Sequence, residues 1–155
     1  MPGTSALGEE KILIFILAGR QFAVEIGGVE QILEYQPPIP TPRRPSYVEG
    51  ILEHRGHYVP VMSLGKRLGV AEAASLYSAI VLLRGIGSDP LVGLIVDQVV
   101  RILPVSPEGI LAPPPRVFGI RAEFVRGVVN VGGRPVVWLD AAKLLTSPEP
   151  ISLLA

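Results

Sequence analysis

The sequence of 155 residues contains no cysteine, so it can form neither disulfide bonds nor thiolate metal sites. Its 14 basic and 14 acidic residues balance, which leaves no net charge to attract nucleic acid or an anionic membrane. The longest apolar run, Ile12–Ala18, is far too short to span a bilayer. Residues 1–10 lack the basic and apolar segments of a signal peptide. We therefore expect a soluble protein of the reducing cytosol.

The sequence also lacks the motifs by which common enzymes are recognised. It has no Gly-x-Ser-x-Gly elbow, no His-Glu-x-x-His helix and no phosphate-binding loop. Its two histidines, His54 and His57, flank a predicted turn, and only Glu53 lies close enough in sequence to act as a further metal ligand. We interpret the histidines as solvated polar residues of a hairpin. We therefore predict no catalytic activity, no metal and no cofactor.

What the sequence does contain is a series of short segments rich in valine and isoleucine. Apolar residues make up 48% of the chain and charged residues 18%, which favours a folded core over disorder. Glycine, proline or polar turns bound each segment, as is typical of strands. The predicted strands are 12–17, 22–26, 51–54, 58–62, 79–83, 91–96, 128–131 and 136–139, and 29–35 and 99–103 are expected to continue the meander. Short helices are predicted only near 64–70 and 141–145, so the fold class is all-β.

The second half of the chain repeats the first half in looser form. Residues recur 77 positions later in one region and 70 positions later upstream of it. The matches include Val48 with Val125, Gly50 with Gly127, Gly56 with Gly133, Val59 with Val136, Ile32 with Ile102, and Leu33 with Leu103. The repeat predicts a duplicated supersecondary unit; chance similarity between two apolar strands is the alternative. In a duplicated unit we expect Val48, Ile51, Val59 and Val61 to be buried in one half, and Val125, Val128, Val136 and Trp138 in the other.

Sixteen prolines argue further against a helical protein. They cluster at 37–45 and 113–115, just before the two strands that contain Gly50 and Gly127. Proline lacks a backbone donor and suits connections that protect a sheet edge; a polyproline ligand is the alternative. Short strands in two halves fit either one sandwich or two small barrels. The repeat favours two barrels fused through a shared apolar core.

The two copies differ at the apex of one hairpin. The second copy has Gly132-Gly133, a pair that a tight turn prefers because both central positions can take positive φ. The first copy has Arg55-Gly56 at the same place. An arginine where glycine would fit indicates either a task for the guanidinium, such as gripping a partner's carboxylate, or an ordinary solvated turn residue. The residues alone do not decide between a partner contact and a solvated turn residue.

Several motifs in order carry a family likeness. The run Gly50-Ile-Leu-Glu-His-Arg55-Gly56-His-Tyr-Val-Pro-Val61 resembles the Gly-Val-Ile-Asn-Leu-Arg-Gly-x-x-Val-Pro-Val signature of the CheW family. The hairpin 14–24, the segment Val92–Val99 and the closing stretch 139–145 are similar to other parts of that family. The chain departs from the family pattern at Glu53-His54, where Asn-Leu is usual, and at Ser63, where Asp is usual.

The resemblance implies two intertwined five-stranded SH3-like β-barrels with a pseudo-two-fold relation, plus short helices. It implies one CheW-like domain at 12–146, with internal repeats 12–68 and 79–145, between a disordered tail at 1–11 and a tail at 147–155. We adopt this division of the chain as an expectation.

The resemblance also implies a function. CheW-family proteins are adaptors that couple methyl-accepting chemoreceptors to a CheA-type histidine kinase in bacterial chemosensory arrays. The positions that match the family's contact with the receptor's cytoplasmic tip are Val29, Gly50, Arg55 and Gly56. The kinase's regulatory domain is expected to pair with the barrel ends, through residues that the resemblance does not specify. The protein would then be cytoplasmic and reach membrane-bound arrays through its partners. A divergent double-barrel module that binds peptides or small ligands outside chemotaxis is the alternative.

Overall fold

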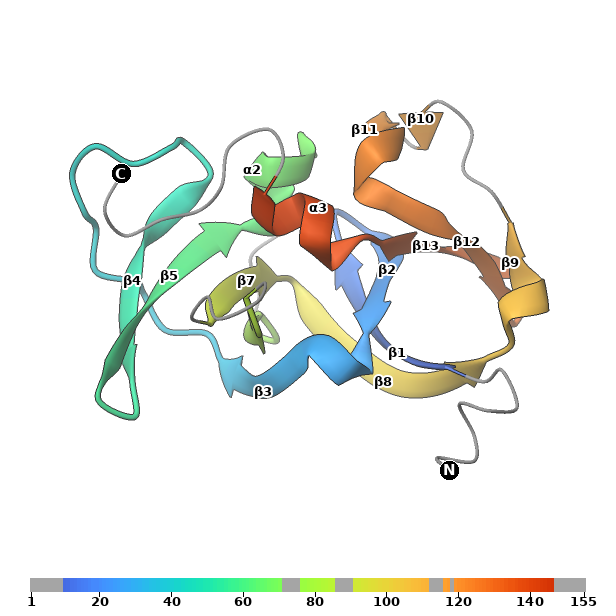
Figure 1. The fold of residues 1–155 in the computed structure, drawn as a ribbon, viewed down its shortest axis with the longest axis horizontal. Helices are drawn as coiled ribbons and strands as arrows, with labels where there is room; N and C mark the ends of the chain where they lie inside the picture. Colours follow the sequence, from blue (N-terminus) through green and yellow to red (C-terminus); the bar gives the residue numbers. More distant parts are fainter. Residues whose placement is uncertain (1–9, 71–75, 86–90, 112–115, 118, 147–155) are drawn as a thin grey trace.

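The computed structural model describes residues 10–70, 76–85, 91–111, 116–117 and 119–146. Most of these residues form strands, grouped into two large sheets that lie side by side in Figure 1. We call the two units barrel A and barrel B. The all-β prediction is confirmed. Of the expected tails, 1–9 and 147–155 lie outside the described residues, and the first strand already begins at Glu10.

Barrel A combines strands from both ends of the chain. Its strands are β1 (Glu10–Leu17), β2 (Arg20–Glu25), β8 (Gln98–Val105), β9 (Ile110–Leu111), β12 (Val125–Val131) and β13 (Arg134–Leu139). They are hydrogen-bonded in the order β8-β1-β2-β13-β12-β9. The hairpins are antiparallel, whereas β13 runs parallel to β2. The barrel that begins with the N-terminal hairpin β1–β2 is thus closed by strands from the second half of the chain.

Barrel B is built from the middle of the chain. Its strands are β3 (Val29–Glu34), β4 (Val48–His54), β5 (His57–Ser63), β6 (Ala79–Leu83) and β7 (Val92–Val96). Their order is β3-β6-β7-β5-β4, and β5 runs parallel to β7. The first five strands of the barrel A sheet, β8-β1-β2-β13-β12, have the same arrangement, and the parallel pair β2–β13 corresponds to the parallel pair β7–β5. The predicted duplication is therefore present in the topology as well as in the residues.

One expectation about strand pairing is wrong. The segments at 29–35 and 99–103 form strands, but they do not continue a meander. β3 leaves the hairpin β1–β2 and pairs with β6 of barrel B, and β8 leaves β6–β7 and pairs with β1 of barrel A. This exchange of third strands intertwines the two barrels. Local patterns show that a segment is a strand but carry little information about its partner.

The short elements lie between and beside the barrels. They are the helices α2 (Leu64–Leu68) and α3 (Ala141–Thr146), the 3-10 turns η1 (Ile26–Gly28), η2 (Pro107–Gly109) and η3 (Ala122–Phe124), and the two-stranded ribbon of β10 (Arg116–Val117) and β11 (Ile120–Arg121). Figure 1 shows α2 and α3 close together where the barrels meet. The expected first helix is shorter than 64–70, because Gly69 adopts φ 79° and ends it.

Three groups of buried side chains hold this arrangement together. The largest contains residues of both barrels and of α2 and α3, including the stacked rings of Phe15 and Phe22. A smaller cluster fills barrel A around Trp138, and another fills barrel B around Ile80. The largest cluster crosses the boundary between the barrels, and neither barrel alone buries it. The two barrels thus share the core that the sequence predicts.

The predicted burial of matching positions is confirmed at six of the eight residues. Val48, Val59, Val61, Val125, Val136 and Trp138 are buried. Ile51 and Val128 are only partly buried. These two residues are equivalents in the repeat, so the structure differs from the expectation at the same place in both copies. Each pairs with a segment on the free side of its strand, Ile51 with Ile39 and Val128 with Leu111.

Candidate protein-interaction surfaces

The hairpin that carries Arg55 has the conformation expected for a tight turn. Arg55 has φ 53° and Gly56 φ 81°, while Gly132 and Gly133 have φ 59° and 83°. The two turns therefore share one backbone geometry, a left-handed pair in which arginine is strained and glycine is not. Arg55 is exposed, and within the described part of the chain no hydrogen bond or ion pair engages its guanidinium. Figure 1 shows the β4–β5 hairpin projecting away from the rest of the molecule.

The four predicted contact residues occupy three different settings. Arg55 and Gly56 lie at the exposed hairpin tip. Gly50 is buried in β4, at one edge of the barrel B sheet. Val29 begins β3, at the other edge, where it packs against the shared core. The sheet order does not bring these residues together, so they do not form a single cluster within barrel B.

Gly50 has a packing role that the sequence does not reveal. Its φ is 151°, and a Cβ at this position would collide with the backbone carbonyl of Ile39 and come within 2.6 Å of that carbonyl's carbon. Gly127 is its equivalent, where a Cβ would lie 2.9 Å from the carbonyl oxygen of Leu111. Both glycines sit at a register shift of their hairpin. Close approach of a crossing segment therefore explains why both copies have glycine here.

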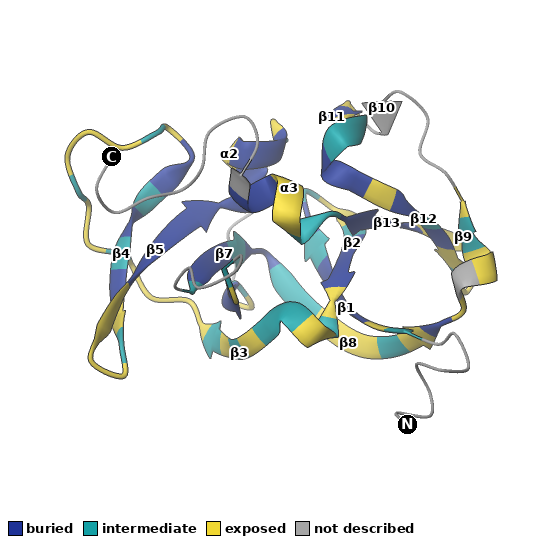
Figure 2. Cartoon of the chain, in the orientation of Figure 1, coloured by how far each residue is buried: buried dark blue, intermediate teal, exposed yellow. Residues whose placement is uncertain are grey.

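Exposed apolar side chains lie on β8, on β3 and just after the end of β3, and the sequence analysis did not predict them. We define the β3–β8 surface by four side chains: Ile32 (39% exposed), Tyr35 (45%), Val100 (39%) and Ile102 (51%). Ile32 and Ile102 are equivalents in the repeat. Figures 1 and 2 show both strands on the lower side of the molecule, with exposed and intermediate positions along them. Ile32 has the same parity along β3 as Glu30 and Glu34, which could have indicated its exposure, since successive side chains of a strand point to opposite faces.

Ser63, one of the two departures from the family pattern, has a structural task. It is fully buried, and its Oγ accepts a hydrogen bond from the backbone N of Lys66 at 3.0 Å, which caps α2. In the second copy the Oδ1 of Asp140 accepts from the backbone N of Lys143 at 3.2 Å. Serine and aspartate are both good N-caps. The change from Asp to Ser at this position therefore preserves the helix start.

The other departure places a histidine at the end of β4. His54 pairs across the hairpin with His57, and the Nε2 of His54 is buried without a hydrogen-bond partner. The described residues contain no group of three side chains arranged to hold a metal ion. Among those same residues, no helix is long and apolar enough to cross a membrane.

These features define a class of protein: a double β-barrel with SH3-like subdomains, a projecting arginine and exposed apolar strand faces. Residues 11–149 match the family model of the CheW-like domain. The chain is 35% identical to "Chemotaxis protein CheW" of Treponema pallidum over 143 residues, covering 90% of this chain and 84% of that protein. It is 30% identical to "Chemotaxis protein CheW" of Rhizobium meliloti, covering 92% and 91%. The chain belongs to the CheW-like domain family.

A solved structure agrees with this assignment. The scaffolding protein TtCheW from Thermoanaerobacter tengcongensis superposes with a TM-score of 0.84 at 29% sequence identity. The match covers 93% of this chain and 92% of that chain. The expected pair of SH3-like barrels is thereby confirmed.

Proposed function

We propose that this chain is a non-enzymatic adaptor that couples chemoreceptors to a CheA-type histidine kinase. Family membership supports this proposal, because the relatives include proteins named for chemotaxis and a protein named as a scaffold. We also propose that residues 12–146 act as one unit, since the shared core joins both barrels. In this proposal the protein works in the cytoplasm and reaches membrane-bound receptors only through its partners.

The observation that carries the proposal is the strained arginine at the β4–β5 tip. Arg55 holds φ 53° in a turn where its equivalent is Gly132, and its side chain is exposed. Ala18 and Arg43 also have φ near 53–54°, so the support comes from the exposed guanidinium that stands at the place of Gly132 and not from the strain alone. A guanidinium is suited to a carboxylate on the receptor's cytoplasmic tip, because it can donate two parallel hydrogen bonds.

The β3–β8 surface supplies the apolar part of the proposed receptor contact. Val29 lies on β3 with Ile32, and Val99 lies on β8 with Ile102. Val29 and Val99 pack against the shared core, so this surface is anchored on the rigid centre of the molecule. We propose that the receptor tip lies along this surface and reaches Arg55. Gly50 supports the hairpin and does not itself bind.

Calorimetric titration tests this function directly. The chain is titrated separately with a receptor cytoplasmic tip and with the regulatory domain of a CheA-type kinase from the same organism. The proposal expects both to bind with micromolar affinity, as is usual for transient signalling contacts of modest area. The same mixtures are also followed by NMR. If neither partner produces heat or a chemical-shift change, the proposal is contradicted.

A further inference from the structure

The matching faces of β3 and β8 differ in charge. The two strands correspond at an offset of 70, so Ile32 matches Ile102 and Glu34 matches Pro104. All four residues are exposed. The β3–β8 surface therefore has an apolar residue at the same place in both strands, but a carboxylate follows it only in β3.

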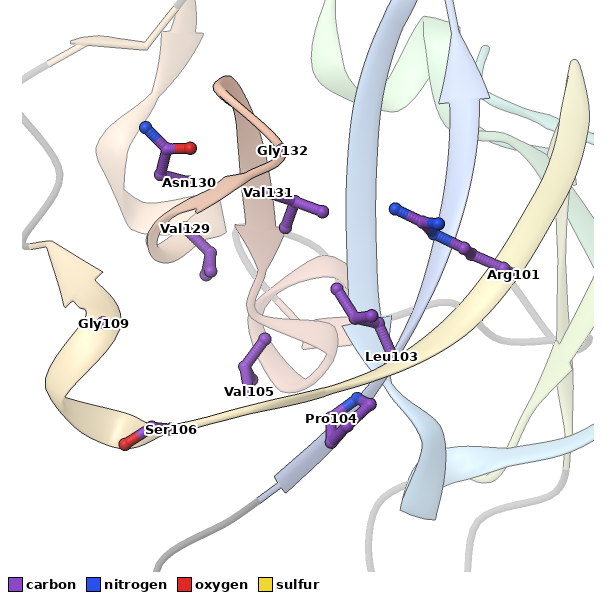
Figure 3. A pocket seen from close by; sticks show the side chains of 10 residues that line it. All are labelled: Arg101, Leu103, Pro104, Val105, Ser106, Gly109, Val129, Asn130, Val131 and Gly132. Carbon is purple, nitrogen blue, oxygen red and sulfur yellow. The ribbon is translucent and has the colours of Figure 1, made fainter.

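The charged residue of β8 points away from this surface. Figure 3 shows the side chains of Arg101 and Leu103 directed toward the pocket that they line beside β12. Pairing with β1 agrees, because Arg101 lies opposite Ile14 and Leu103 opposite Ile12, and both isoleucines belong to the core of barrel A. Ile102 stands between Arg101 and Leu103 in the sequence and so faces the other side of the strand. The part of the β3–β8 surface that β8 supplies is therefore uncharged.

Glu34 lies close to Ile32 on the same face of β3. Ile32 pairs with Val81 and Glu34 with Ala79, and no register shift separates the two pairs. The side chains of Ile32 and Glu34 therefore point to the same side of the strand. Two residues of a strand span about 7 Å. This spacing is close to one turn of a helix, about 5.4 Å, so a helical partner could meet both residues with side chains one turn apart.

β3 has a second exposed carboxylate, Glu30, but an ion pair within the chain neutralises it. The Nη2 of Arg84 lies 3.1 Å from the Oε1 of Glu30. Arg84 also donates to the carbonyl oxygen of Gly27, which holds the guanidinium in place. Among the described residues, no ion pair engages Glu34. Glu34 is thus the carboxylate of β3 whose charge is available to a partner.

We propose that Glu34 selects receptor tips that carry a lysine or arginine about one helical turn from the apolar residue that packs on Ile32. An exposed carboxylate attracts a cation on the partner and repels an acidic group, so it discriminates between receptors of different charge. Its charge is opposite to that of Arg55, and two opposite charges at different places favour one register of the partner along the surface. This inference rests on the proposed receptor contact, to which it adds the charge of the partner.

Calorimetric titration of the full chain with the receptor cytoplasmic tip of the same organism measures the effect of this carboxylate. Glu34→Gln keeps the size of the side chain and should weaken binding about two- to fivefold, the range of an exposed ion pair. Glu34→Lys adds repulsion to the lost attraction and should weaken binding about four- to 25-fold. Glu108→Gln removes the same charge from an exposed residue of η2, outside this surface, and should bind like the parent. Unchanged or tighter binding by Glu34→Gln would overturn the proposal.

Salt distinguishes attraction between charges from a change in packing. The ratio of the affinities of the parent and Glu34→Gln should be largest at an ionic strength of about 0.01 M, where the Debye length is about 30 Å. It should approach one near 1 M, where that length is about 3 Å. Thermal melting of each variant controls for folding. A ratio that does not change with salt would assign the loss to packing and overturn the proposal.

A charge exchange identifies the cation on the receptor. Each lysine and arginine of the receptor tip is changed to glutamate in turn, and each tip variant is titrated against the parent chain and against Glu34→Lys. One tip variant should bind Glu34→Lys more tightly than it binds the parent, because the exchanged charges attract again. If no tip variant does so, Glu34 has no cationic partner and the proposal is wrong.

The parent chain separates this inference from the proposed function. If the parent binds the receptor tip and the Glu34 variants bind it equally well, only the charge preference is overturned. If the parent binds neither the receptor tip nor the kinase domain, the adaptor function is overturned, and this inference with it.

Discussion

Arg67 donates a hydrogen bond from its Nε to the carbonyl oxygen of Leu144 at 3.0 Å, and Leu144 is the residue that stands at the position of Arg67 in the second repeat. The Arg67 guanidinium carbon also lies 4.5 Å from the ring centre of Tyr47 and 5.1 Å from that of Phe124. Tyr47 and Phe124 are themselves equivalents. One side chain therefore touches both copies of the repeat where the barrels meet.

This position predicts a large effect on stability. Arg67 is only 9% exposed, so Arg67→Ala removes two ring contacts and leaves the Leu144 carbonyl without that donor. The free energy of unfolding should fall by about 2–4 kcal/mol. Arg67→Lys should recover only part of the loss, because an ammonium lacks the planar face that stacks on a ring. Urea denaturation measures the effect, with the exposed Arg43→Gln as control. If Arg67→Ala and the control unfold at the same urea concentration, the contact between the two barrels does not depend on this residue.

Gly50 predicts a different kind of failure. In Gly50→Ala the new methyl group must displace the Ile39 backbone, and a φ of 151° is strained for alanine. We expect a loss of about 2–4 kcal/mol in the free energy of unfolding. Gly109→Ala is the matched control, because nothing lies within 4 Å of a Cβ at that glycine. A Gly50→Ala variant that melts like the parent but fails to bind a receptor tip would instead make Gly50 a contact residue.

The β3–β8 surface predicts a loss of binding without a loss of stability. Ile32→Asp and Ile102→Asp place a charge on exposed strand positions, which should weaken binding of the receptor tip by about 1–3 kcal/mol each. Leu76→Asp changes an apolar residue that is 99% exposed and lies outside this surface, so its affinity should equal that of the parent. Calorimetry and thermal melting are run on each variant. If all three bind equally well, the receptor does not use this surface.

The sequence predicted a large part of this fold. Short valine-rich segments gave the strands, and the matches at Gly50 with Gly127 and at Gly56 with Gly133 predicted the duplicated barrels. The strand patterns did not predict the exchange of β3 and β8 between barrels, because hydrophobic alternation specifies a strand's faces and not its neighbours. Only the family resemblance implied that the barrels are intertwined.

The candidate site was predicted less completely. The turn at Arg55 followed from comparison of the two copies, since local geometry determines which residues suit a tight turn. The packing role of Gly50 depends on Ile39, in the connection before β4, which folds back to pair with Ile51. The contact that Arg67 makes between the two barrels joins residues 77 positions apart in the sequence. Neither has a local pattern that would reveal it.

The measurement that tests the central claim most directly compares Arg55→Gly with the reciprocal Gly132→Arg. Glycine relieves the strain at φ 53°, so Arg55→Gly should melt at the same temperature as the parent or higher. Its affinity for the receptor tip should nonetheless fall by about 1–3 kcal/mol. Arg55→Lys should recover only part of this loss.

Gly132→Arg places the same residue in the equivalent turn of barrel A, where it should lower the melting temperature and add no receptor affinity. Calorimetric titration with the receptor tip and thermal melting on the same preparations measure both quantities. The account predicts that binding is lost while the fold is preserved in Arg55→Gly. Parental affinity in Arg55→Gly would contradict it and leave Arg55 as a solvated turn residue.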